Sequence, residues 1–233
     1  MFPIPNRIIL TYKHKNIPDY VIKNIKKLNN EKQILFFDDE DVVKFLLKEY
    51  DSSYVDFFHS VKLGCTKGDF FRYCYLLKHG GYYSDIDIQH IEPMYKYVEQ
   101  DLEFFSVNAA IGPMTFQALL YCQPEHPIIQ DCIVDIMNPE TAKDPFYSTT
   151  EHMYKNIKKY LGFKGHVNSG AYRRNDTNTV IQIAQEVMIN NAYACLYRNK
   201  IIAMSRYPEY KREEGFVKKW EKREYYSVVR LHF

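Results

Sequence analysis

Segments typical of strands and of helices alternate through the first half of the chain, and this alternation restricts its fold more than any other feature. Residues 7–12, 33–37 and 82–88 are short and mostly apolar, which favours buried strands. Amphipathic or acid-capped segments, typical of helices, lie around them at 18–28, 38–50, 54–63 and 66–78. Strands separated by helices predict an α/β fold with an open sheet.

The second half continues this mixture less regularly. We expect strands or strand–helix pairs at 102–107 and 114–121, and late strands at 201–205 and 225–233. We expect helices at 127–137, 151–161 and 179–189. A chain of 233 residues without an internal repeat or a low-complexity linker suits a single domain, 1–233.

An aspartate pair follows the third expected strand. The helix at 66–78 stops near Gly80, and the strand after it leads into Asp85 and Asp87. Side chains of a strand repeat every second residue, so we expect both carboxylates to point the same way and Ile86 to point into the sheet. Paired hard oxygen ligands suit Mg²⁺ or Mn²⁺, with water or phosphate in the remaining positions. A solvated turn at the strand end is the alternative.

Two motifs resemble a known enzyme family. The pattern D-x-x-R-Y from Asp69 to Tyr73, followed by G-G-x-Y-x-D-x-D, resembles the DxD region of the GT-A glycosyltransferases of family 32. It also resembles the glucosyltransferase domain of the large clostridial toxins. Residues 4–13, I-P-N-R-I-I-L-T-Y-K, are similar to the first strand of family 32. The resemblance implies a GT-A type (Rossmann-like) open mixed sheet flanked by helices. It places nucleotide-sugar binding in about 1–110 and the acceptor side in about 111–233.

The resemblance also implies a site for the donor sugar. Asp69 would accept hydrogen bonds from sugar hydroxyls, and Arg72 would orient both Asp69 and the sugar or phosphate. Tyr83 matches a family tyrosine close to the donor. From the residues alone, Asp69 and Arg72 are also explained by an exposed ion pair between helix neighbours, and Tyr83 by a core tyrosine.

Thr11, Tyr12 and Lys13 follow the first expected strand. Ligands of open α/β folds collect at the carboxyl ends of strands. The resemblance places the nucleotide base and ribose at these three residues, where the Tyr12 ring would stack on the base.

The expected cofactor is Mn²⁺ or Mg²⁺. We expect Asp85 and Asp87 to bind the metal directly or through water, and the resemblance adds His232, because many GT-A enzymes take a third ligand from a late histidine. A histidine in a frayed tail is the alternative for His232. The residues expected to act in catalysis are Asp69, Arg72 and Asp87.

Charge and cysteine usage argue against other classes of protein. A net charge of +2 gives no electrostatic case for nucleic acid. Five cysteines without C-x-x-C spacing argue against a disulfide framework and a structural zinc site, and reduced thiols indicate a cytoplasmic protein. The N-terminus lacks a signal-peptide pattern, and no apolar run approaches the ~20 residues of a membrane span. The basic segment 218–223 around Trp220 is typical of a mixed-charge helix, with peripheral contact to an anionic membrane as the alternative.

The combined expectation is a metal-dependent hexosyl- or deoxyhexosyltransferase. It would move a sugar from a nucleotide donor to a hydroxyl of a glycan or glycoconjugate, in polysaccharide biosynthesis in a bacterium or a virus-infected cell. A UDP-sugar is favoured over a GDP-sugar, and the family implies retention of configuration. Two alternatives stay open: an inactive module that binds a nucleotide or glycan, and a metal-dependent phosphoryl-transfer enzyme. The low net charge and the missing P-loop argue against the second.

Overall fold

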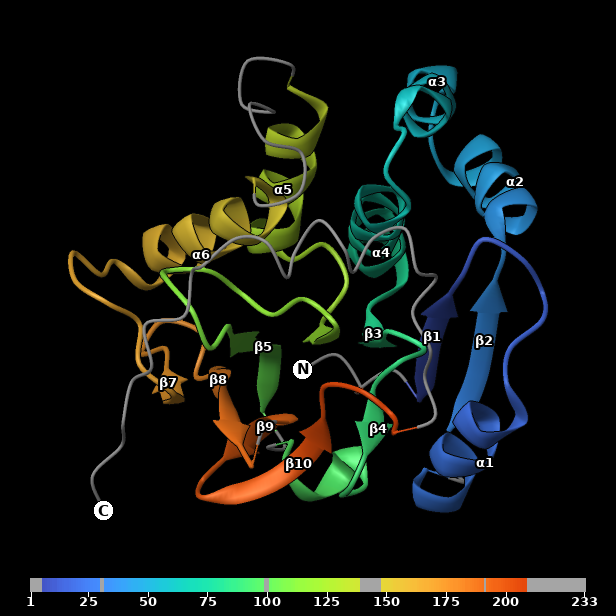
Figure 1. Ribbon diagram of the computed structural model, residues 1–233. Helices are drawn as coiled ribbons and strands as arrows, with labels where there is room; N and C mark the ends of the chain where they lie inside the picture. The colour runs from blue at the N-terminus through green and yellow to red at the C-terminus, as the bar shows by residue number, and fades with distance from the viewer. Residues whose placement is uncertain (1–5, 30–31, 99–100, 139–147, 191, 209–233) are drawn as a thin grey trace, which may run out of the picture.

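The computed structural model describes residues 6–29, 32–98, 101–138, 148–190 and 192–208 (Figure 1). The strands are β1 (Arg7–Thr11), β2 (Gln33–Phe37), β3 (Gly81–Ser84), β4 (Gln89–His90), β5 (Leu102–Asn108), β6 (Leu119–Cys122), β7 (Gly170–Arg173), β8 (Val180–Ile189), β9 (Ala192–Tyr197) and β10 (Lys200–Met204). The helices are α1 (Asp19–Leu28), α2 (Asp39–Glu49), α3 (Ser52–Ser60), α4 (Gly64–His79), α5 (Pro127–Met137) and α6 (Ser148–Leu161), with a 3₁₀ turn at Met94–Lys96.

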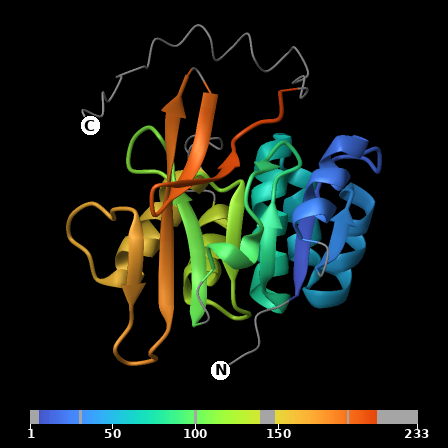
Figure 2. The same ribbon diagram turned by 90° about the horizontal axis from the view of Figure 1, so that it is seen from below.

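One curled sheet contains all of the strands that the structure describes (Figures 1 and 2). The strand order is β2-β1-β3-β6-β5-β8-β9-β10-β4, and β7 also pairs with β8. β1 is parallel to β2 and β3, and β5 is parallel to β8, whereas the other pairs are antiparallel. The expected open mixed sheet flanked by helices is confirmed. The sheet joins strands from both halves of the chain, and the extent of a single domain over 1–233 stays a prediction.

Two apolar cores lie on the two faces of the sheet. On β1, Ile9 belongs to one core and Ile8 and Leu10 belong to the other. Helices α2 to α6 cover the Ile9 face, and α1 covers the opposite face (Figure 1). Burial on both faces explains why β1 is a continuous apolar run rather than an alternating one. Within the described ranges, no helix is both long and apolar enough to cross a lipid bilayer.

Gly80 joins α4 directly to β3. Its backbone has φ +59°, a conformation that favours glycine, and a Cβ at this position would lie 2.7 Å from the carbonyl oxygen of Cys122. The tight reversal brings the first turns of α4 to the carboxyl end of β3. β1 ends at the same edge because it is parallel to β3, and β6 begins there because it is antiparallel to β3.

Several expectations about single elements are confirmed and others are wrong. The acidic start of α2 is a cap, since the Asp38 carboxylate accepts a hydrogen bond from the backbone N–H of Asp41 at 2.9 Å. The helix expected at 179–189 is wrong, because Val180–Ile189 forms β8 and pairs with β5, β7 and β9. Its apolar residues fit both the helical period of about 3.6 residues and the strand period of two. The β-branched Val and Ile side chains favour a strand, and pairing with neighbouring strands on both sides stabilises it. β7 and β9 were not expected, and the strand expected at 225–233 lies outside the described residues.

Candidate functional site

Arg72 is the centre of a polar cluster at the edge of the sheet where β1 and β3 end. Its Nη2 lies 3.1 Å from Asp69 Oδ1 and 3.1 Å from Asp85 Oδ1. Its Nη1 donates to the backbone carbonyl of Gln117 at 2.6 Å, just before β6. The Arg72 side chain is only 5% exposed and that of Asp69 only 12%, so the pair is not the exposed ion pair that helix spacing alone would allow. One guanidinium therefore joins α4, the segment after β3 and the segment before β6.

Tyr83 completes the support of Asp85. Its hydroxyl donates to Asp85 Oδ1 at 2.7 Å, and the Arg72 guanidinium lies 4.3 Å from the centre of its ring. Burial raises the pKa of Tyr83 well above its usual value, so the phenol keeps the proton that it donates. Tyr83 is buried, as a core tyrosine would be, and it also contacts the cluster.

Burial and charge act against each other in this cluster. Burial raises the pKa of Asp69, and the nearby Arg72 charge and the Thr149 hydrogen bond reduce that rise without cancelling it. Burial lowers the pKa of Arg72, but Asp85, Tyr83 and Asp69 outweigh this effect and raise it above its usual value. The guanidinium therefore stays charged between two carboxylates.

The aspartate pair lies in a turn and not in a strand. β3 ends at Ser84, and the backbone N–H of Ile88 donates to the carbonyl of Asp85 at 3.2 Å. The strand expected at 82–88 is therefore wrong beyond Ser84, and the turn that was the alternative is present. The common direction of the two carboxylates loses its basis in strand periodicity and stays a prediction. The strand ends because the pairing of β3 with β6 ends at Ser84 and Leu119. The buried side chain of Ile86 belongs to the core on the α1 face, as does that of Tyr82 in β3.

Backbone contacts hold this turn on both sides. The N–H of Asp85 donates to the carbonyl of Ala118 at 2.8 Å, and the carbonyl of Asp87 accepts from the N–H of Tyr207 at 3.0 Å. Behind the turn, Ser84 Oγ lies 3.0 Å from His90 Nε2. Burial lowers the pKa of His90 to about 4, so this imidazole is neutral near pH 7. The aspartates therefore stand on a fixed backbone.

Thr11, Tyr12 and Lys13 lie at the same edge as the cluster. A Cβ added to Gly68 would lie 3.6 Å from Arg72 Nη2 and 3.9 Å from the Thr11 methyl carbon, so Thr11 borders the cluster. Thr11 Oγ1 donates to the carbonyl of Phe37 at 3.0 Å. The Tyr12 ring is half-buried and packs edge-on against His14 at 4.7 Å between centroids, and Lys13 is exposed.

The residues present fit a hydrated Mg²⁺ or Mn²⁺ ion. Asp85 and Asp87 offer hard carboxylate oxygens in one turn, and such ions are commonly bound by one or two carboxylates plus water and phosphate. In the described ranges, no group of three or more His, Cys, Asp or Glu side chains is placed to hold a metal. His232, the expected third ligand, lies outside those ranges, and so does the basic segment 218–223.

Two residues of the cluster were missed from the sequence. Thr149, in the first turn of α6, donates from its hydroxyl to Asp69 Oδ2 at 2.6 Å. Gln117 provides the carbonyl that binds Arg72, and its side-chain Oε1 accepts a short hydrogen bond from the Tyr73 hydroxyl. Gln117 Nε2 is buried without a hydrogen-bond partner among the described residues. No motif marks either residue, because both reach the cluster from distant segments.

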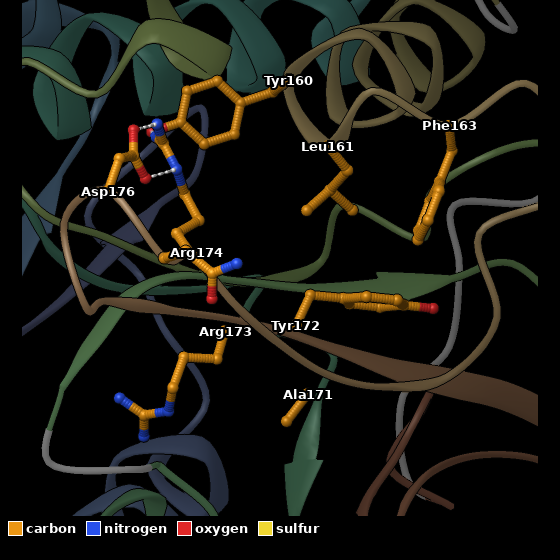
Figure 3. Close-up of a pocket in the computed structure, with 9 residues that line it drawn as sticks. Tyr160, Leu161, Phe163, Ala171, Tyr172, Arg173, Arg174 and Asp176 are labelled. Atoms are coloured by element: carbon orange, nitrogen blue, oxygen red, sulfur yellow. Dashed lines mark hydrogen bonds and ion pairs between the residues drawn. The ribbon is translucent and has the colours of Figure 1, made fainter.

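A separate pocket of about 600 Å³ lies at the other edge of the sheet (Figure 3). It lies between the end of α6 and β7, where Arg174 contacts Tyr160 and Asp176 and where Leu161, Phe163 and Tyr172 line the opposite side. Arg174 Nη1 also lies 3.9 Å from Glu103 Oε1, near the amino end of β5. The pocket is thus separated from the Arg72 cluster by the length of the strands.

The comparisons with known proteins point to the first of these two places. Residues 18–105 match the family described as glycosyltransferase sugar-binding region containing DXD motif. The matched segment contains the residues of the Arg72 cluster and of the aspartate turn, namely Asp69, Arg72, Tyr83, Asp85 and Asp87.

One viral protein and one solved structure are similar to the chain. An uncharacterized glycosyltransferase of Acanthamoeba polyphaga mimivirus, L373, is 32% identical over 90 residues. That match covers 36% of this chain and 36% of the viral protein, so the chain spans about a third of its length. The match to the solved structure of PaToxG glycosyltransferase covers 69% of this chain and 70% of the PaToxG chain, with a TM-score of 0.51 and 14% sequence identity. The expected GT-A type fold is confirmed by this structural likeness together with the mixed sheet.

Proposed function

We propose that the protein transfers a sugar from a nucleotide-sugar donor to a hydroxyl of a glycan or glycoconjugate, in a metal-dependent reaction. The observation that carries the proposal is the single buried guanidinium of Arg72 between Asp69 and Asp85. It couples a carboxylate suited to sugar hydroxyls with one suited to a metal ion. The location of all these residues in a DXD-containing sugar-binding region supports the same conclusion.

Each residue of the cluster has a separate task in this proposal. Asp69 accepts hydrogen bonds from hydroxyls of the donor sugar, and Arg72 fixes the direction of Asp69 while its charge faces the phosphates. Tyr83 and Arg72 hold the Asp85 carboxylate in one orientation. A divalent ion held by Asp85 and Asp87 would neutralise the charge that develops on the leaving nucleoside diphosphate. Thr11, Tyr12 and Lys13 flank the nucleotide.

We propose a UDP-sugar as the favoured donor, with a GDP-sugar as second choice, and retention of configuration. In a retaining reaction on one face of the sugar, the departing phosphate accepts the proton of the acceptor hydroxyl. Such a reaction needs no separate strong base beside the cluster. We also propose a cytoplasmic location, because five free thiols, four of them buried, suit a reducing compartment.

Calorimetric titration with UDP and with GDP, each with and without Mn²⁺, tests the donor site. We expect one nucleotide, with UDP favoured, to bind only when the metal is present, because phosphate oxygens complete the coordination of the ion. The preferred nucleotide identifies the donor class. Absence of binding by both nucleotides with Mn²⁺ present would contradict the proposal.

Cys65 gives a second test that does not depend on activity. Its thiol lies in the first turn of α4, close enough to Asp69 and Arg72 to interact with their charges, and it is the exposed one of the five cysteines. We expect a nucleotide sugar at ten times its Kd to slow alkylation of Cys65 by iodoacetamide about tenfold, because only free protein reacts. Peptide mass spectrometry measures the rate.

The conditions and control for this experiment follow from the site. Burial raises the pKa of the Cys65 thiol, so the reaction is run at mildly alkaline pH. ATP at the same concentration serves as the nucleotide that should not protect. An alkylation rate that a saturating nucleotide sugar leaves unchanged would place the donor away from α4.

A further inference from the structure

The first turn of α6 reaches the Arg72 cluster through two neighbouring residues. The Thr149 hydroxyl donates to Asp69 Oδ2 at 2.6 Å, and both side chains are buried. The carbonyl of Thr150 accepts from both the backbone N–H and the hydroxyl of Thr115, each at 3.1 Å. Thr115 lies two residues before Gln117, whose carbonyl binds Arg72. The first turn of α6 therefore contacts Asp69 directly and also the segment that binds Arg72.

The number of hydrogen bonds that Asp69 can accept indicates what the Thr149 hydrogen bond does. An ionised carboxylate accepts about four hydrogen bonds, two on each oxygen. Arg72 occupies one position on Oδ1 and Thr149 one on Oδ2, and these are the partners of the carboxylate among the described residues. One position on each oxygen remains, and the two fixed bonds determine its direction. Two hydroxyl groups of one sugar ring can use this pair of positions.

We propose that Thr149 is a positioning residue for the donor sugar. Its hydrogen bond to Oδ2, together with the bond of Arg72 to Oδ1, fixes the orientation of the Asp69 carboxylate. This inference rests on the proposed function and deepens it. It assigns a sugar-recognition role to the second half of the chain, outside the matched segment 18–105. Because Thr149 acts on the sugar and not on the nucleotide, loss of its hydroxyl should weaken binding of the nucleotide sugar and leave binding of the free nucleotide unchanged.

Thr149→Val tests the proposal, since valine keeps the shape of threonine and removes the hydroxyl. The probes are UDP and GDP and the nucleotide sugars UDP-glucose, UDP-galactose, UDP-N-acetylglucosamine and GDP-mannose, titrated with Mn²⁺. We expect the affinity for the best-bound nucleotide sugar to fall about tenfold, as for loss of one hydrogen bond to a charged group. The affinity for the corresponding free nucleotide should stay within about twofold. Thr149→Ser should restore the wild-type ratio of the two affinities.

The chain offers a matched control. Thr179 Oγ1 donates to Glu103 Oε2 at 2.7 Å, a bond of the same kind at the opposite edge of the sheet. Thr179→Val should change neither affinity. If Thr149→Val does not fold, Thr149→Cys takes its place, because cysteine is a much weaker donor of similar size.

The outcomes separate this inference from the proposed function. If the wild-type protein binds nucleotide sugars and Thr149→Val has the same ratio of nucleotide-sugar affinity to nucleotide affinity as the wild type, the role of Thr149 is overturned and the proposed function is not. Equal weakening of sugar nucleotide and nucleotide also overturns it, since it indicates a general structural effect. A wild-type protein that binds none of the probes overturns the proposed function, and the inference with it.

Discussion

Replacement of Arg72 by methionine is expected to lower the free energy of unfolding by about 3–5 kcal/mol, the usual cost of removing one partner of a buried ion pair. The expected cost is high because the guanidinium has partners on three segments, namely Asp69, Asp85 and the carbonyl of Gln117. Methionine fills most of the space but leaves the buried Asp69 carboxylate without its charged partner. Chemical denaturation followed by circular dichroism measures the change in midpoint and slope.

Arg198→Met is the control for this experiment. Arg198 is exposed in the turn between β9 and β10 and lies beside the ring of Tyr197 at 5.2 Å. Its replacement should change stability by less than about 0.5 kcal/mol. Equal and small effects of both substitutions would mean that the Arg72 cluster contributes little to folding, and ligand binding would then be its remaining role.

The first half of the fold was predictable because its signals are local. β1, β2 and the helices α1, α2 and α4 are marked by short apolar runs, by the Asp38 cap and by Gly80. β8 was mistaken for a helix because its apolar residues satisfy both periods. Its pairing with β5 and β9 joins residues far apart in sequence, and no local pattern records that pairing.

The candidate site also contains residues that a local motif predicts and residues that only the fold brings to the site. Asp69, Arg72, Tyr83 and Asp85 occur within one short motif, and the structure brings these four together. Thr149 is 80 residues from Asp69, and Gln117 is 45 residues from Arg72. The turn at the aspartate pair was only the alternative to a strand, because the end of the β3–β6 pairing at Ser84 decides between them and the spacing of the two aspartates does not record that pairing.

Arg72 links stability to the proposed function. A guanidinium that is buried between two carboxylates is costly to place, and its partners must hold it in one geometry. The same rigidity would give the donor a prepared site, in which Asp69 and Asp85 do not need to reorganise on binding. The proposed donor site and the local stability of the sheet edge therefore depend on the same hydrogen bonds.

Asp87→Asn is expected to lower turnover at least about a hundredfold with little loss of stability. Asparagine is nearly isosteric, and the backbone carbonyl of Asp87 that accepts from Tyr207 is retained. The charge that helps to hold a divalent ion is lost, and such an ion contributes several kcal/mol of transition-state stabilisation, with each 1.36 kcal/mol worth a factor of ten in rate. Release of nucleoside diphosphate from the preferred nucleotide sugar measures turnover, even with water as a slow acceptor.

Asp56→Asn on the exposed surface of α3 is the matched control and should keep wild-type turnover and metal dependence. A titration with Mn²⁺ then distinguishes two causes of low activity in Asp87→Asn. Partial recovery at high Mn²⁺ means that the variant binds the ion weakly, which supports the assignment of Asp87 as a ligand. Wild-type turnover with an unchanged Mn²⁺ requirement would remove Asp87 from the metal site, and Asp85, fixed by Arg72 and Tyr83, would be left as the one aspartate of the turn with a role in binding the donor.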